Sequence, residues 1–570
     1  MNEQRNLWVA IASAVVILIG WQFFFAPEPG PQVREAQVRE QLDANGTNTP
    51  QVSTGGPSVP GGQPAVPTVN RDDALAKSPR IIIETPRVEG SIRLVGGVID
   101  DIQLQDYRET EEPDSPLIHV LNPTGSNDAY FAEFGWVAGE KGVNLPNSDT
   151  RWTASSDKLR PDSPVTLSWD NGAGLTFKRQ IAIDENYLFT VNQSVVNNSG
   201  GEVTLYPYGL ISRKNKPHTA GFYILHEGPL GVIDGTLTEI DYDDLADDGA
   251  VEKKTTGGWL GITDKYWLVA LAPSADEALT ARFSHHVADN SDKYQTDYLG
   301  APRTIADGAE AAAETRLFAG AKEVTLLDNY AEEYGITNFD LAIDFGWFYF
   351  LTKPFFLVLQ WLYHLVGNFG VSILLLTVAV KAIMFPLANK SYKSMSAMKK
   401  LQPQITKMRE QFKDDRQRQQ QEMMALYKRE KINPASGCLP IVVQIPVFFA
   451  LYKVLFVSIE MRHAPFFGWI QDLSAPDPTS LFNLFGLIPW DPPQMLMIGI
   501  WPLIMGVTMF LQQKLNPAPA DPTQAKIMMF LPLIFTFMLA SFPAGLVIYW
   551  AWNNTLSILQ QRYIMYKMGV

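Results

Sequence analysis

Long apolar runs occur at the start of the chain and toward its C-terminal end, and short alternating runs fill the region between them. Residues 7–25 are 19 uncharged residues, enough for a helix to cross a hydrocarbon core ~30 Å thick. Arg5 precedes this run and an aromatic cluster ends it, as expected for a span whose N-terminus stays in the cytoplasm. A cleaved signal peptide would have a shorter apolar region and a small-x-small site, which "FFFAPEPG" does not offer. We therefore predict that residues 1–25 are an uncleaved membrane anchor.

The region between the apolar runs divides into a polar stretch and a stretch that alternates with period two. Residues 26–79 are rich in Pro, Gly, Gln and Ser and poor in large apolar residues, so we expect a disordered periplasmic tether. Later runs such as "GLTFKRQIAI" alternate, with Leu175 and Phe177 on the apolar side. Arg179 falls on that side and breaks the alternation. Many such runs predict a large periplasmic antiparallel β-sandwich over residues 80–340.

The C-terminal part of the chain has the pattern of helices separated by short breaks. Residues 341–366 put Lys353, Gln360 and His364 on one helix face, so we expect this helix to lie in the membrane interface rather than to cross it. It ends at "VGNFG", and residues 367–570 then form a core of five spans. These spans are predicted at 371–388, 438–459, 495–514 and 527–565, the last divided by "FPAG" into a hairpin of two. With the anchor, the prediction is six transmembrane helices.

A charged segment, residues 389–437, joins the first two spans of this core. Its apolar residues recur every three or four positions, which predicts a helical hairpin, with Pro403 kinking or interrupting the first helix. Such a stripe is most simply explained as the seal between the two helices. The alternative is that its flexible methionines contact varied apolar segments of a substrate. These methionines are Met395, Met398, Met408, Met423 and Met424.

Charge is distributed unevenly along the chain and indicates the orientation of the spans. Residues 26–345 hold 25 basic against 49 acidic residues, a net charge of −24, whereas residues 346–570 hold 20 against 10, a net charge of +10. The hairpin segment holds 12 Lys and Arg, but residues 460–494 hold only Arg462. Short basic loops stay in the cytoplasm and base-poor loops are exported, so we predict that the hairpin and both termini are cytoplasmic. A single cysteine, Cys438, excludes an internal disulfide.

Several polar residues fall inside the predicted spans, and Lys381 is the most costly of them. A Lys at the centre of a span costs roughly 2.5–3.5 kcal/mol on insertion scales, so it needs water, a partner or access to the headgroups. Lys381 lies ~10 Å from the end of its span along a helix and could partly snorkel to the surface. Its polar neighbours, which singly are explained as hydrogen bonds between helices, together favour a shared hydrated cavity open to the cytoplasm. The predicted groove residues are Lys381, Thr377, Gln444, Thr508, Gln512, Trp550 and Asn553, with Ser557 and Gln560 following in the last span.

No Asp or Glu occurs in the five C-terminal spans, so the sequence offers Lys381 no counter-ion there. A proton-coupled transporter would place carboxylates in its spans, and repeated halves are frequent in secondary transporters. Neither is present, which leaves a small-solute transporter or channel as the weaker alternative. The chain also lacks P-loop, CxxC, HExxH and GxSxG motifs. We predict that it is not an enzyme and needs no cofactor or metal, and that Lys381 meets a transient anionic group from another chain.

Four segments of the C-terminal region together carry a resemblance to a known family. They are "KAIMFPLANKSYKSMSAMKKLQPQI", "QEMMALYKREKINPASGCLPIVVQIPVFFALYKV", "PLIMGVTMFLQQKL" and "FPAGLVIYWAWNNTLSILQQ". They resemble the YidC family of membrane protein insertases in its Gram-negative form. The resemblance is dense from about residue 340 to 565, and the anchor, tether and exported domain agree with it in order and length. It implies a chaperone and insertase that inserts membrane proteins and helps them fold in the bacterial inner membrane, alone or with the Sec translocon. Nascent membrane proteins, the ribosome and the lipid bilayer are the implied partners, with no specific nucleic-acid sequence.

The resemblance also implies roles for individual residues. Lys381 matches the cation of the family's hydrophilic groove, and Thr377 and Trp550 match positions of substrate contact. The exported domain is similar to a sugar-mutarotase-like β-sandwich, and the hairpin is expected to receive substrate. The groove cation is commonly Arg, and Lys381 lacks the two-pronged carboxylate grip of a guanidinium. The chain ends at "QQRYIMYKMGV" without the basic extension that some relatives have, so we expect ribosome contact at the basic loop.

Overall fold

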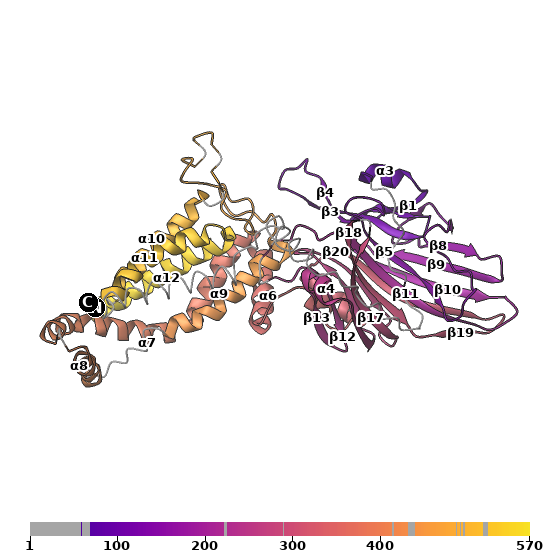
Figure 1. The fold of residues 1–570 in the computed structure, drawn as a ribbon. Helices are drawn as coiled ribbons and strands as arrows, with labels where there is room; N and C mark the ends of the chain where they lie inside the picture. The colour runs from indigo at the N-terminus through magenta and orange to yellow at the C-terminus, as the bar shows by residue number, and fades with distance from the viewer. Residues whose placement is uncertain are drawn as a thin grey trace, which may run out of the picture. The chain divides into compact units, whose positions relative to one another are not determined.

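A computed structural model describes two compact units of this chain, one ending at Asp344 and one beginning at Phe345 (Figure 1). The first unit is built of strands and the second of helices. The predicted anchor, residues 1–25, lies outside the described residues, as does most of the predicted tether. The described residues are Val59 and residues 69–219, 221, 225–288, 290–412, 415–430, 439–485, 487–490, 492–493, 496–516 and 522–569.

The first unit is a sandwich of two sheets. Among the described residues, neighbouring strands run antiparallel in both sheets, apart from the parallel pair β1 and β7. This confirms the β-sandwich predicted from the period-two runs. The first sheet has the order β14 (Val251–Thr256), β17 (Ala278–Ala288), β18 (Ser291–Gly300), β11 (Val203–Lys214), β5 (Tyr130–Ala138), β3 (Val98–Arg108), β2 (Val88–Arg93), β1 (Arg80–Glu84) and β7 (Lys158–Leu159). In addition, β19 (Arg303–Ile305) pairs with β11 and β4 (Leu117–Leu121) pairs with β3.

The second sheet places β9 and β10 beside each other, and their register explains the apolar alternation. Phe177 lies opposite Val195 and Ile181 opposite Val191, so both strands turn the same period-two set of side chains inward. The strand order is β13 (Thr236–Glu239), β12 (Gly228–Ile233), β15 (Trp259–Thr263), β16 (Trp267–Pro273), β20 (Glu310–Ala321), β10 (Leu188–Asn197), β9 (Leu175–Ile183), β8 (Val165–Asp170) and β6 (Thr153–Ala154).

Arg179, which breaks the alternation of β9 in the sequence, joins the two sheets. Its buried guanidinium donates hydrogen bonds to the carbonyl of Gly97, at 2.5 Å, and to the carbonyl of Phe134. The guanidinium also lies over the ring of Trp152, 4.9 Å from its centroid. Burial lowers the pKa of Arg179 to about 10. The residue therefore binds backbone carbonyls of the facing sheet where an apolar side chain would only fill space.

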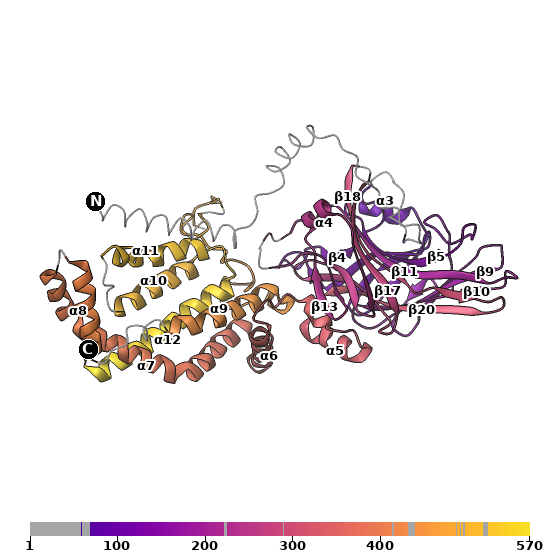
Figure 2. The same cartoon turned by 60° about the horizontal axis from the view of Figure 1, so that its bottom comes forward.

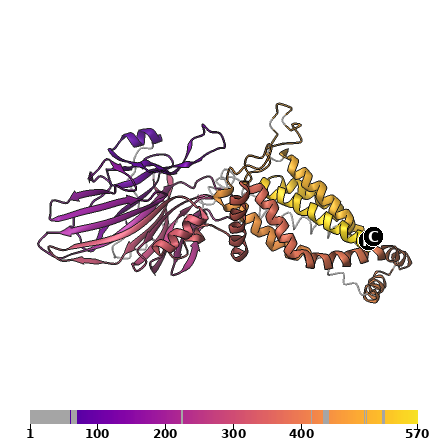
Figure 3. The same cartoon turned by 180° about the vertical axis from the view of Figure 1, so that it is seen from behind.

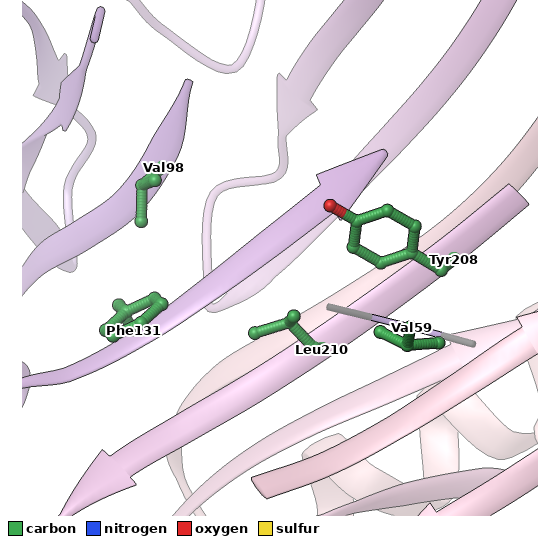
Figure 4. Close-up of a cluster of buried hydrophobic side chains, with 5 residues drawn as sticks. All are labelled: Val59, Val98, Phe131, Tyr208 and Leu210. Atoms are coloured by element: carbon green, nitrogen blue, oxygen red, sulfur yellow. The ribbon is translucent and has the colours of Figure 1, made fainter. Parts of the chain in front are cut away.

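The ordered part of the first unit begins earlier in the chain than the sequence indicates. Val59 is buried against β3, β5 and β11 in a cluster with Val98, Phe131, Tyr208 and Leu210 (Figure 4). A short helix, α3 (Arg71–Ala76), follows, and the side chain of Asn70 caps its N-terminus. The prediction of disorder up to residue 79 is therefore wrong for these residues, because a few apolar side chains in the polar stretch pack onto the sandwich. The remaining helices of the unit are α4 (Tyr242–Asp248), α5 (Val324–Tyr334) and η1 (Phe339–Ala342).

The second unit is a helical bundle with breaks at two of the predicted positions. Gly367 ends the first helix in the left-handed conformation, and the side chain of Asn368 caps the next one. The "FPAG" sequence likewise separates the last two helices. The elements are α6 (Tyr349–Val366), α7 (Phe369–Gln411), α8 (Arg416–Arg429), α9 (Leu439–Val457), η3 (Ile459–Met461), α10 (Ile500–Leu515), α11 (Pro522–Leu539) and α12 (Ala544–Met568).

Helix α7 is one continuous helix of 43 residues that leads from α6 to α8 (Figure 3). It contains both Pro386 and Pro403, so Pro403 does not interrupt the helix, and a kink at Pro403, the other predicted outcome, stays a prediction. A proline removes one backbone hydrogen bond, and the packing of α8 on this part of α7 retains the helix. Among the described helices, α7 is long and apolar enough to cross a membrane, and residues 444–457 and 525–539 form shorter apolar helices.

The helices of the bundle are arranged around α12. Helix α12 packs against α7 and α10, and α10 lies between α11 and α12 (Figure 2). Helix α6 packs against α7 and α9 through Thr352, Phe356 and Leu359, and exposes apolar side chains on its other face, including Phe350 and Trp361. The position of this helix in the membrane interface stays a prediction.

Candidate functional site

Helix α12 carries the polar residues to which the polar residues of α7, α9 and α10 are hydrogen-bonded. Its N-terminus is held by two backbone hydrogen bonds, from Ala544 to the carbonyl of Ala475 at 2.7 Å and from Gly545 to the carbonyl of Leu473 at 2.9 Å. Because this end of α12 is fixed, the residues along it keep a defined rotation toward the neighbouring helices. The site is best described one neighbouring helix at a time.

Lys381 of α7 is joined to Ser557 of α12. The ammonium donates a hydrogen bond of 2.7 Å to the Ser557 hydroxyl, which donates in turn to the carbonyl of Asn553 at 2.8 Å. Ser557 and Asn553 are buried, and Lys381 is partly buried. Among the residues that the structure describes, Lys381 forms no ion pair. The sequence predicted the absence of a resident carboxylate but not the pairing with Ser557.

Helix α9 meets α12 through one hydrogen bond and one aromatic contact. The amide of Gln444 donates to the Tyr549 hydroxyl at 2.5 Å. The ring of Trp550 lies 4.6 Å from that of Phe448 on α9 and 6.0 Å from that of Phe535 on α11, measured between centroids. Gln444 and Trp550, two predicted site residues, are therefore neighbours at the contact of α9 with α12.

Helix α10 meets a different face of α12, and two of the residues there are not among the predicted ones. Asn554 donates to the Thr508 hydroxyl at 3.4 Å, and Gln561 donates to the side-chain carbonyl of Asn516 at 3.2 Å. Asn554 and Gln561 are both almost fully buried. They are seven residues apart, which places them on one face of the helix, and this spacing is the signal in the sequence that could have identified them.

Two predicted residues stand apart from these contacts. The Thr377 hydroxyl is buried and donates to the carbonyl of Ile373 in its own helix at 2.7 Å. Gln512 is partly exposed on α10, and within the described part of the chain no hydrogen bond joins it to the residues above. The structure therefore brings together Lys381, Asn553, Gln444, Trp550 and Thr508 around α12, but not Thr377 or Gln512.

The methionines of the hairpin fall into three groups. Met408 and Met423 pack with Tyr427 against a buried cluster of Leu401, Ile405 and Leu426 between α7 and α8, so they seal the hairpin. Met395 and Met398 pack with Tyr392 against Ile564 of α12. Met424 is different because 57% of it is exposed. Of the five predicted contact residues, Met424 is thus the one on the open face of α8.

The arrangement has the chemistry of a site for reversible polar contact. The hydrogen bonds around α12 join neutral hydroxyls and amides, apart from the one that Lys381 donates. A neutral acceptor compensates an ammonium less well than a carboxylate does, because only the carboxylate adds the Coulomb attraction of a full negative charge. No group of His, Cys, Asp or Glu side chains that could hold a metal occurs in the described segments.

Similarity to known proteins extends over both units. Residues 80–358 match the family model described as "YidC periplasmic domain", and residues 361–569 match the model described as "60Kd inner membrane protein". A "Membrane protein insertase YidC" of Methylorubrum extorquens is 52% identical over 592 residues, covering 100% of this chain and 96% of that protein.

Two solved structures are similar to parts of the chain. An active YidC insertase with its first transmembrane domain resolved gives a TM-score of 0.35 at 19% identity, and covers 85% of this chain and 92% of its own. A galactose mutarotase-like protein from Lactobacillus casei gives a TM-score of 0.30 at 12% identity, and covers 42% of this chain and 99% of its own.

Proposed function

Because the chain belongs to the YidC family of membrane protein insertases, we propose that it receives substrates in a polar groove centred on Lys381 and α12. The protein is a membrane protein insertase of the inner membrane with a periplasmic domain, and its substrates are nascent membrane proteins. The proposal concerns how it acts. One observation carries it: the Lys381 ammonium is hydrogen-bonded to the neutral Ser557 hydroxyl and forms no ion pair among the described residues.

In the first step, an apolar segment of the substrate meets the open face of the hairpin. Met424 is exposed there, and a methionine side chain adapts to segments of different shape. The polar flank of the segment then enters beside α12. The groove residues replace part of the water around that flank, which lowers the cost of moving it toward the membrane centre.

In the second step, an acidic group on the flank takes the place of Ser557 as the acceptor of the Lys381 hydrogen bond. Giving up the hydrogen bond from the ammonium to Ser557 costs about 1.5–3 kcal/mol, the usual range for a bond to a charged group, whereas two opposite charges 4 Å apart attract by about 4 kcal/mol at an effective dielectric constant of 20. The exchange is therefore favourable. Release needs no nucleotide, because burial of an apolar span in lipid gains ~25 cal/mol for each Å² removed from water.

The membrane arrangement belongs to the same proposal. Six spans, with the hairpin and both termini in the cytoplasm, are supported by the basic composition of the hairpin and by the length and apolarity of α7. The interfacial position of α6 is supported by its exposed apolar face. Cysteine labelling from each side of the membrane tests the orientation of the spans: positions in α8 should react only from the cytoplasm.

Ribosome and Sec translocon contact are proposed as partner interactions on the same basis. Residues 389–437, with 12 Lys and Arg, offer positive charge to the phosphates of ribosomal RNA. A small-solute transporter is not favoured, since the family is one of insertases. The absence of an enzymatic activity remains a prediction, which assays of the β-sandwich with free sugars would test.

Site-specific photocrosslinking tests the groove directly. A photoreactive amino acid at 381 or 550 should crosslink to a stalled nascent chain, and one at Leu533, which is 56% exposed on α11, should crosslink to lipid. Position 377 separates the sequence-based prediction from the structure, because Thr377 is buried and should crosslink weakly. Crosslinks from Leu533 as strong as those from 381 would contradict a groove at α12.

A further inference from the structure

The segment between η3 and α10 begins with a rigid base, residues 464–480. The Asn368 side chain donates to the carbonyls of Pro465, at 3.3 Å, and Phe466, at 3.2 Å, while it also caps α7. Two backbone bonds join the base to the first residues of α12. The segment is therefore fixed to the N-terminal ends of α7 and α12, at the end of α7 far from the hairpin.

The buried carboxylate of Asp477 attaches the same base to α10. It accepts hydrogen bonds from the backbone N–H and hydroxyl of Thr479, the backbone N–H of Trp501 and the indole N–H of Trp469. The Thr479 hydroxyl also accepts from the N–H of Ile500. These bonds satisfy donors in the first turn of α10, where a carboxylate is favoured.

Beyond this base, residues 481–485 and 487–490 belong to a loop with an almost wholly apolar surface, named here the apolar loop. It is the orange-brown loop that stands away from the helices near α10 (Figure 1). No charged residue occurs from 478 to 490. Leu487 is 83% exposed, more than most apolar side chains on a water-facing surface. The other exposed apolar residues include Phe482, Leu484, Phe485, Ile488 and Trp490.

The backbone of the apolar loop is bonded to itself and to its base. The N–H groups of Phe485 and Ile488 donate to the carbonyls of Ser480 and Asn483, and that of Leu481 donates to Ile498. Leu484 and Phe485 have φ values of 49° and 59°, in the left-handed region that bulky residues rarely occupy. The loop thus keeps a disfavoured backbone in which several N–H groups are bonded within the segment while its apolar side chains are exposed.

The apolar loop has a fixed base, an uncharged apolar surface and a bonded backbone. These three properties point to one kind of surroundings. Water would not favour such a surface, and a strand-type protein partner needs free backbone groups, which the bonded turn does not offer at these positions. The acyl region of a bilayer accepts apolar side chains and requires internally bonded backbone. The loop is also bonded to the segment that precedes α10, since the N–H of Leu481 donates to the carbonyl of Ile498. We propose that the apolar loop inserts into the lipid at the headgroup–acyl boundary, on the side of the membrane opposite the hairpin.

The inference does not depend on the groove, because it needs only that α9 and α10 are embedded in the membrane. Lipid contact at the apolar loop gives the bundle a second interfacial attachment besides α6. It holds the base, and with it the ends of α7, α10 and α12, at a fixed depth. Insertion activity is therefore not the readout that tests it.

The test measures the depth of a label on the full-length protein. The single cysteine, Cys438, is replaced by serine, and Leu487→Cys is labelled with a fluorophore in vesicles of phosphatidylethanolamine and phosphatidylglycerol. We expect a lipid with a nitroxide near the top of its acyl chain to reduce the emission roughly twofold or more, and aqueous iodide to have little effect. Labelled Leu533→Cys on α11 is the lipid-exposed control, and Val287→Cys, 66% exposed on β17, is the water-exposed control.

Two results would overturn the proposal. If iodide quenches the label at 487 as strongly as the label at 287, the apolar loop lies in water. If neither quencher reaches it, a protein covers the loop. Labelled Ile488→Cys serves as a second site in the same loop, so that one poorly folded variant does not decide the outcome.

Discussion

The ammonium of Lys381 and the hydroxyl of Ser557 form a hydrogen bond of 2.7 Å between α7 and α12. The Ser557 hydroxyl donates its own hydrogen bond to the carbonyl of Asn553, and the Tyr392 side chain is hydrogen-bonded to it as well. The cation is thus held in one position by a neutral partner. It is oriented without being neutralised, which is what transient recognition of an anionic group requires.

Replacing Lys381 separates charge from hydrogen bonding. Lys381→Arg should preserve insertion, because the positive charge remains. Lys381→Ala and Lys381→Glu should reduce insertion of an acidic-flanked substrate about tenfold, equivalent to ~1.4 kcal/mol. The measurement is protease protection of the substrate in proteoliposomes. Normal insertion by Lys381→Ala would mean that the electrostatic step is absent.

Ser557→Ala provides the matched control for Lys381. The substitution removes the neutral acceptor but keeps the cation, so insertion should stay within about twofold of the unchanged protein, as a net hydrogen bond is worth ~1 kcal/mol. A loss as large as that of Lys381→Ala would show instead that the bond between the two helices, and not the free charge, matters.

The hairpin offers a comparison between a contact residue and a sealing residue. Met424→Ser should weaken crosslinking of the hairpin to an apolar substrate, with little change in protease resistance, because Met424 is exposed. Leu426→Ala should instead increase proteolysis of the hairpin, since loss of a buried leucine costs about 2–5 kcal/mol. The idea that Met424 contacts substrate fails if Met424→Ser leaves the crosslinks unchanged.

Asp477 is expected to be the most sensitive residue of the rigid base. Asp477→Ala leaves four donors without their acceptor, and one unsatisfied buried group costs about 1–3 kcal/mol. The melting temperature of the detergent-solubilised protein should fall by several degrees. Asp477→Asn keeps one oxygen acceptor, so its melting temperature should lie between that of Asp477→Ala and that of the unchanged protein. Equal melting temperatures for Asp477→Ala and the unchanged protein would contradict this role.

Arg179 should be important for the stability of the sandwich. Arg179→Met leaves the carbonyls of Gly97 and Phe134 without their donor and should lower the free energy of unfolding by ~2 kcal/mol. Urea denaturation of the first unit, which has its own core, measures this. Lys178→Met is the control on the exposed side of the same strand and should change the value by less than about 0.5 kcal/mol.

Lys322 should make the stability of the sandwich depend on pH. Burial lowers the pKa of this lysine to about 8 from an ordinary value of 10.5, and its ammonium donates to the Thr263 hydroxyl. Above pH 8 the unfolded chain binds more protons than the folded one, so stability should rise by about 1–2 kcal/mol between pH 7.5 and 9.5. Below pH 7.5 this contribution is constant. Lys322→Met should remove the rise, and an unchanged slope would assign it to other groups.

The sequence was sufficient for features that depend on local pattern. Period two predicted the inward face of β9, including Leu175 and Phe177, because alternation is imposed by the strand itself. The breaks at Gly367 and at "FPAG" were predictable for the same reason, since glycine and proline act on the backbone where they stand.

Features that depend on a partner far along the chain were not predictable. Arg179 was visible only as an irregularity, because the carbonyls it binds belong to β5 of the other sheet and to the turn before β3. Asn554 and Gln561 were missed because the face of α12 they occupy matters only once α10 lies against it. Pro403 does not interrupt α7, because the packing of α8 compensates the cost of a proline inside the helix, and the sequence shows that cost without the packing. The sequence identified Lys381 by the free-energy cost of a lysine inside a span, but it did not identify Ser557 as the acceptor of its hydrogen bond.

The unbroken course of α7 places the hairpin segment and Lys381 on one helix. A straight helix would transmit every rotation of its hairpin end to Lys381. Pro386 lies between them and lacks the N–H that would bond the preceding turn, so the helix bends there at lower cost than elsewhere. A force applied at the hairpin would therefore bend α7 at Pro386 and leave the Lys381 ammonium in place beside Ser557.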